Sequence, residues 1–108
     1  MDERLIQEHR RLRAKAQALR VAAIRTRLSA AFTFCSVVET EARWESAERA
    51  RASFERLQNS IRELDFHIHE PRHVPMESRH ALSATLRELK KRAQEIKASL
   101  QRRSPRLP

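Results

Sequence analysis

The sequence predicts an all-α protein: an antiparallel three-helix bundle of coiled-coil-like hairpins with a long first helix. Its 108 residues contain no Gly and only four Pro, so few turns can require a positive φ angle. Apolar residues also recur in alternating steps of three and four, which is the spacing of one helical face. The length fits a single helical domain, expected over residues 1–103. A disordered tail is expected at 104–108.

The clearest pattern predicts a helix over about 47–69. Ser46 is a good N-cap, and Pro71 and Pro75 should end the helix near His69. The apolar stripe of this segment consists of Ala47, Ala50, Phe54, Leu57, Ile61, Leu64 and Ile68. Because so regular a stripe has to be covered, the flanking segments should pack against it.

The first helix is expected over about 2–43, where neither Gly nor Pro interrupts the chain. Its second half carries a similar stripe, broadened by Phe32 and Phe34, which consists of Leu28, Ala31, Cys35, Val38 and Ala42. Its first half has leucines every seven residues, with two alanines on the same side: Leu5, Leu12, Ala16, Leu19 and Ala23. This half should be either a coiled-coil arm or a frayed extension.

A third helix is expected over about 76–101, with a stripe that matches the second helix in step and length. The stripe consists of Leu82, Leu86, Leu89, Ala93, Ile96 and Leu100. If both connections are tight, about 20 residues of the first helix overhang the bundle, by the rise of a helix per residue. A second copy of the chain is the simplest cover for this overhang, so we expect a homo-oligomer, a dimer, or a complex with another protein.

In the first hairpin, residues 27–61, the second helix carries Ala50 and, four residues later, Phe54. The hairpin thereby resembles one tetratricopeptide-like unit, because in that family an Ala followed four residues later by an aromatic residue marks the second helix. Phe34 falls where the first helix of the family carries a large apolar residue, whereas Val38 and Glu41 depart from the pattern. The resemblance implies protein–protein interaction, with the third helix or a partner completing the solitary unit.

Basic charge lies at both ends of the chain. The net charge is +9, with eight Lys and Arg against three acids in residues 1–30 and eight against two in residues 81–108. The candidate basic surface comprises Arg10, Arg11, Arg13, Lys15, Arg20, Lys90, Lys91 and Arg92. These residues could bind nucleic acid through its phosphates. They are dispersed around the helices, however, and no recognition-helix motif accompanies them.

Four of the five histidines lie together in the sequence, at His67, His69, His73 and His80. His69, His73 and His80 are weak candidates for a metal site, but the spacing argues against one, since no His-x3-His pair lies within one helix. We expect a polar loop that closes one end of the bundle. Such a cluster could also make that end sensitive to pH.

Catalysis has no support in the sequence. The chain lacks a Gly-rich phosphate loop, Tyr, and a carboxylate pair on an apolar face, so we expect no enzyme activity, no cofactor and no small-molecule substrate. The lone cysteine, Cys35, is expected to be buried and unreactive, which fits a cytoplasmic protein. The longest nearly apolar segment, 30–38, is too short for a bilayer. The expected function is a small interaction or scaffolding module, and the alternative is non-sequence-specific nucleic-acid binding.

Overall fold

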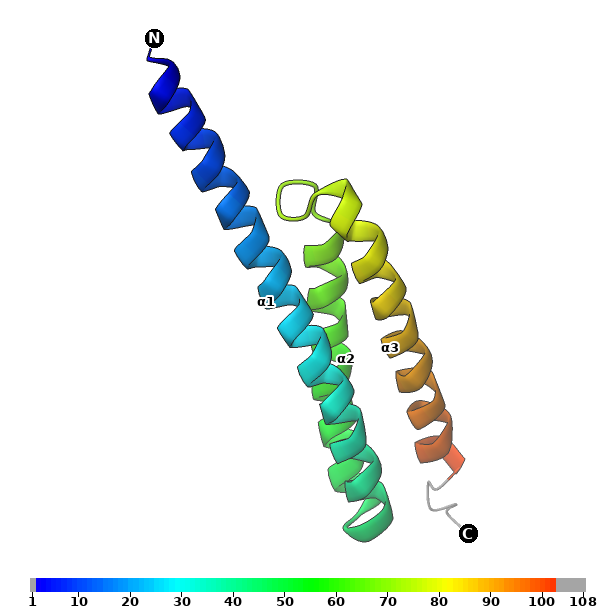
Figure 1. Ribbon diagram of the computed structural model, residues 1–108. Coiled ribbons are helices and arrows are strands. Elements are labelled where there is room, and N and C mark those ends of the chain that lie inside the picture. Colours follow the sequence, from blue (N-terminus) through cyan, green and yellow to red (C-terminus); the bar gives the residue numbers. More distant parts are fainter. Residues whose placement is uncertain (1, 103–108) are drawn as a thin grey trace.

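The computed structural model describes residues 2–102 and contains three helices (Figure 1): α1, Glu3–Trp44; α2, Ala47–His69; and α3, Met76–Arg102. α2 runs antiparallel to both other helices, and each helix packs against the other two. The all-α fold and the three helices were therefore predicted from the sequence, with ends that differ by at most one residue. The tail predicted at 104–108 lies outside the described residues.

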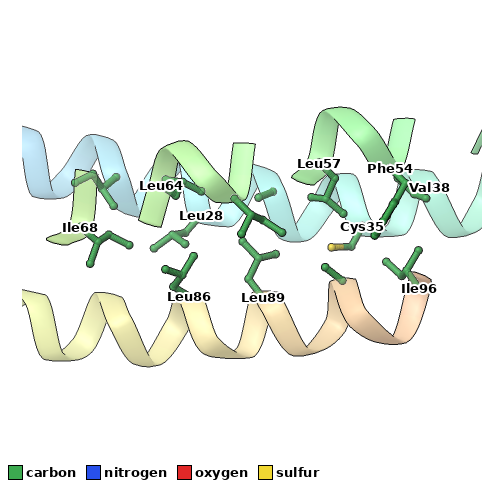
Figure 2. Close-up of a cluster of buried hydrophobic side chains, with 14 of the residues drawn as sticks. Leu28, Cys35, Val38, Phe54, Leu57, Leu64, Ile68, Leu86, Leu89 and Ile96 are labelled. Carbon is green, nitrogen blue, oxygen red and sulfur yellow. The ribbon is translucent and has the colours of Figure 1, made fainter. Parts of the chain in front are cut away.

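The core is one continuous cluster in which all three helices bury one stripe (Figure 2). The predicted stripes of α2 and α3 are buried, except that Ala47 is half-buried. Leu57, Leu64 and Leu89 are at most 1% exposed. Each buried Leu contributes about 1.5–3 kcal/mol through removal of apolar surface from water. The interior is thus closely packed along the whole length of α2.

The inner stripe of α1 begins earlier than predicted, at Val21. Val21 and Ile24 are buried ahead of Leu28 and continue its three-and-four spacing. Phe32 and Phe34 are half-buried at the two edges of the stripe. The earlier start was not predicted, because the leucines of the first half lie on another side of α1 and dominate the apolar pattern before Leu28.

Two residues reverse the chain between α1 and α2. The Glu45 amide donates to the Glu41 carbonyl at 2.9 Å and closes α1, and the Ser46 hydroxyl accepts from the Arg49 amide at 3.0 Å. Ser46 is therefore the N-cap of α2, as predicted. So short a turn holds the two helices in a tight antiparallel pair.

The loop between α2 and α3 is less polar than expected, because Val74 is 1% exposed and closes that end of the core. The amides of His73 and Val74 donate back to the Glu70 carbonyl, at 3.0 and 3.4 Å. Arg79 of α3 donates from Nη2 to the Val74 carbonyl at 3.1 Å. The two prolines end α2, and Val74 then anchors the loop.

α1 is one uninterrupted helix that extends far beyond this loop (Figure 1). We call residues 3–20 the arm, within which no residue is buried, and residues 21–44 the body. By length and composition alone, α1 is also apolar enough to cross a membrane. That finding is weak evidence, because a core helix passes the same test, and the inner stripe of the body is already covered by α2 and α3.

Candidate interaction surface

A second stripe without charged residues runs along the whole of α1, on the side away from the core. We call it the outer face. It begins with the three leucines noted in the sequence and continues to the end of the helix in alternating steps of four and three. Its members are Leu5, His9, Leu12, Ala16, Leu19, Ala23, Thr26, Ala30, Thr33, Val37, Thr40 and Trp44.

The outer face lies opposite the inner stripe because the two are two residues out of step. Leu19 precedes the buried Val21 by two positions, which is a rotation of about 200° around the helix. All twelve residues of the outer face are exposed except Ala16, which is half-buried. α1 therefore presents one apolar stripe to its own bundle and another to the outside.

Most of the large apolar side chains that the protein exposes lie on this face. Within residues 2–102 there are seven, and five belong to it: Leu5 (65% exposed), Leu12 (55%), Leu19 (64%), Val37 (41%) and Trp44 (76%). The other two, Phe66 and Met76, lie on different elements. An apolar surface gathered in one line indicates a contact site, whereas scattered exposed residues need no explanation.

The polar members of the outer face have their hydroxyls satisfied within α1. Thr26, Thr33 and Thr40 donate to the carbonyls four residues earlier, at 3.1, 3.2 and 2.8 Å. With these bonds made, covering the hydroxyls with another protein surface leaves no donor unpaired. The threonine half of the outer face can therefore be buried at low cost.

The arm is basic, and the opposite end of α1 is acidic. The arm carries Arg4, Arg10, Arg11, Arg13, Lys15 and Arg20, all of them exposed, against Glu3 and Glu8. Near the other end lie Glu39, Glu41 and Glu45. Arg49 pairs with Glu45 at 3.1 Å and approaches Glu41 at 3.9 Å.

The predicted basic surface does not form one patch. The five residues of its first part lie on the arm, whereas Lys90, Lys91 and Arg92 lie on α3 beside the bundle. Lys90 pairs with Asp65 at 2.9 Å, and Arg92 pairs with Glu39 at 2.7 Å and donates to the Ser36 hydroxyl at 3.0 Å. Two of the three cations on α3 thus connect helices to one another.

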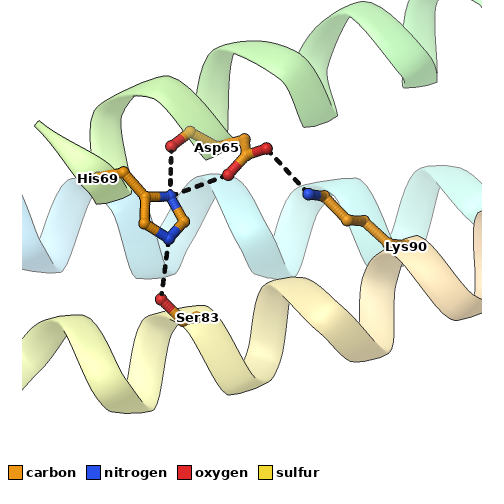
Figure 3. A network of polar contacts seen from close by, with 4 residues as sticks. All are labelled: Asp65, His69, Ser83 and Lys90. Carbon is orange, nitrogen blue, oxygen red and sulfur yellow. Dashed lines mark hydrogen bonds and ion pairs between the residues drawn. The ribbon is translucent and has the colours of Figure 1, made fainter.

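A polar network on α2 and α3 uses one of the predicted histidines (Figure 3). His69 Nδ1 lies 2.9 Å from the Asp65 carboxylate, and Nε2 lies 3.4 Å from the Ser83 hydroxyl. The hydrogen bond from Lys90, followed by its charge and that of His69, lowers the pKa of Asp65 against the opposing effect of burial. This network connects α2 to α3 at the surface.

The other histidines are not gathered into a metal site. His73 stacks near His67, with ring centroids 5.7 Å apart, and His80 is exposed on α3. Among residues 2–102, no group of three or more His, Cys, Asp or Glu side chains is placed to hold a metal ion. The weak candidates His69, His73 and His80 are therefore not brought together.

Cys35 of α1 is fully buried in the core between the three helices (Figure 2). Burial raises the pKa of its thiol, against a smaller opposing effect of Arg92. A protonated, enclosed thiol packs as a small apolar side chain, in agreement with the prediction.

The chain matches no protein-family model, and no significant similarity was found to a curated protein or to a solved structure. The resemblance of residues 27–61 to a tetratricopeptide-like unit therefore remains one of sequence pattern. The function therefore has to be argued from the surface itself.

The arm leucines could be identified from the sequence, but the outer face to which they belong was not predicted. Three threonines and two alanines follow Leu19 at these positions, and such residues do not stand out in an apolar pattern. The pattern that was overlooked is the seven-residue spacing from His9 through Ala16, Ala23, Ala30 and Val37 to Trp44. It becomes visible only when the buried inner stripe is assigned to the opposite side.

Proposed function

We propose that this protein is a self-associating helical interaction module, which acts through protein–protein contact along the outer face of α1 and not through catalysis. One observation carries the proposal: five of the seven exposed large apolar side chains share that face, at heptad positions. Apolar heptads sustained over three or four repeats are typical of coiled coils, and this stripe of twelve positions continues for more than five.

The arm supports the proposal further. Most helical stability in proteins comes from packing of an apolar face and not from intrinsic helix propensity. The arm packs nothing of its own bundle, although Arg20 donates to the Arg72 carbonyl at 3.3 Å at its end. A partner on the outer face would supply the missing packing.

The test is light scattering after gel filtration, across a range of protein concentrations. We expect a dimer for the wild type and a monomer for the double variant Leu12→Glu, Leu19→Glu. The matched control, Gln7→Glu with Ala14→Glu, adds the same charges at the same spacing on the other side of the arm and should remain dimeric. A wild type that is monomeric at every concentration would overturn the proposal.

Nucleic-acid binding is the second candidate, and the exposed cations of the arm favour it. Arg10, Arg11, Arg13 and Lys15 are all exposed on a helix that projects from the bundle. If this function holds, binding to generic DNA and RNA should weaken steeply with salt, as counterion release requires. Arg11→Gln with Lys15→Gln should reduce the affinity and the salt dependence together, without changing the mass measured by light scattering.

A further inference from the structure

We propose that two copies of the chain pair through their outer faces in antiparallel orientation, with the arm of each α1 lying along the body of the partner's α1. This inference rests on the proposed function, because it takes the outer face as the contact surface. It adds the orientation and the register of the second copy, which self-association alone does not specify.

The order of side chains along the outer face fits an antiparallel pair. The face consists of two series with seven-residue spacing, one from Leu5 to Thr40 and the other from His9 to Trp44. In an antiparallel pair each residue of one series faces a residue of the partner's other series. One register matches the large side chains of the arm to the body: Leu5 faces the partner's Trp44, Leu12 faces the partner's Val37, and Leu19 faces the partner's Ala30. Every exposed large apolar side chain of the outer face is then covered.

A parallel pair would use the same residues less well. Each residue would then meet its own copy, so the alanines at positions 16, 23 and 30 would form three layers with little side chain to fill them. Two Trp44 side chains would also meet in one layer. The antiparallel register instead sets Ala16 against Thr33, Ala23 against Thr26 and Ala30 against Leu19, so no layer consists of alanine alone and the pair fills the contact more completely.

Charge also favours the antiparallel pair. A parallel pair would place two basic arms side by side, whereas the antiparallel pair separates them and lays each arm along the end of the partner's α1. That end lies near Glu39, Glu41 and Glu45, whose charges are already paired with Arg92 and Arg49 of their own chain. In the same register, Glu8 flanks the partner's Arg43. The opposed helix dipoles also attract.

One flanking contact joins like charges, because Arg20 comes near the partner's Arg27. The guanidinium of Arg27 already pairs with Glu63 of α2 at 2.8 Å, so it does not face Arg20 as an isolated charge. The repulsion is confined to the middle of the pair, whereas Glu8 and the partner's Arg43 attract each other near each end.

The outer face also leaves room for a second helix. α2 and α3 cover the inner stripe of the body, so a partner helix on the outer face meets α1 with no intervening element. On the arm, the side opposite the outer face carries Gln7, Arg10, Ala14 and Gln17, residues that can remain in water. The arm thus has one apolar side, and the partner's body supplies one to match.

Disulfide trapping tests the register. In a Cys35→Ala background, the single variants Leu12→Cys and Val37→Cys are refolded together under mild oxidation. We expect a crosslinked dimer whose 12–37 bond is identified by mass spectrometry, and no crosslink when either variant is oxidised alone. The control mixture pairs Arg10→Cys with Val37→Cys, and it should stay uncrosslinked because Arg10 lies on the other side of the arm.

The other outcomes separate this inference from the proposed function. A 12–12 crosslink in Leu12→Cys alone would show a parallel pair, and a dimer by light scattering without any crosslink would show a different contact surface or register. Either result overturns the proposed antiparallel register while self-association stands, and a different contact surface also removes the outer face as the site of contact. A monomer by light scattering removes both.

Discussion

The arm and the body of α1 are two stretches of one helix that share the outer face and differ on the inner side. At the inner positions the body carries Val21, Ile24 and Leu28, which α2 and α3 cover, whereas the arm carries Gln7, Arg10 and Gln17. The body is therefore stabilised by its own chain. The arm has only the outward stripe, so its stability should depend on protein concentration.

The largest expected difference concerns a leucine from each stripe. Leu28→Ala removes a side chain that is 2% exposed and should lower the free energy of unfolding by about 2–5 kcal/mol. Leu12→Ala removes one that is 55% exposed and should change it by less than about 0.5 kcal/mol in dilute, monomeric protein. Urea denaturation followed by circular dichroism measures both.

At concentrations that favour association, the same pair of variants should separate differently. Leu12→Ala should then weaken the dimer, whereas Leu28→Ala should destabilise the bundle at every concentration. An equal loss for both variants in dilute protein would contradict the division of α1 into a packed body and an unpacked arm.

A smaller difference is expected between two helix caps. The Ser46 hydroxyl caps α2 inside the cooperative bundle, and the Asp2 carboxylate accepts from the Arg4 amide at 3.0 Å at the start of the arm. Ser46→Ala should cost about 1 kcal/mol in global unfolding, the usual value for a lost N-cap. Asp2→Ala should leave global unfolding unchanged and only increase hydrogen exchange of the first arm amides.

Should Asp2→Ala lower the stability of the whole protein as much as Ser46→Ala does, the arm would be part of the cooperative bundle even in the monomer. Circular dichroism and hydrogen exchange on the same dilute samples distinguish these two results.

Most of the fold could be predicted because each bundle stripe consists of large apolar residues in unbroken helical spacing. The stripe of α3 was predicted residue by residue, and Ser46 and the two prolines marked the connections. Val74 was missed because a single apolar residue between polar neighbours has no periodicity. Its burial follows from where the loop crosses the end of the core, which depends on all three helices.

The candidate surface was predictable only in part. Leu5, Leu12 and Leu19 indicate an apolar stripe in the sequence. The threonines that continue it can be buried only because their hydroxyls form hydrogen bonds within the folded helix, which the sequence does not show. The division of the basic residues was equally hidden. Lys90 and Arg92 resemble the arm cations in the sequence, and only the packing of α3 brings them to Asp65 and Glu39.

The smallest expected effect concerns the ion pair between Asp65 and Lys90 and the pH dependence of the stability that it provides. The hydrogen bond from Lys90 is the main cause of the lowered pKa of Asp65. A lowered folded-state pKa stabilises the protein above the pKa of the unfolded carboxyl, and this stabilisation is lost as the pH falls through the folded-state value. Because both side chains are more than a third exposed, the stabilisation should stay below about 1 kcal/mol.

Asp65→Asn should therefore be slightly less stable than the wild type at neutral pH and equal to it in acid, whereas Glu3→Gln on the arm should match the wild type at both. Urea denaturation at about pH 7 and below about pH 3 measures the free energies of unfolding. If Asp65→Asn is still less stable than the wild type in acid, its effect is due to packing instead of charge.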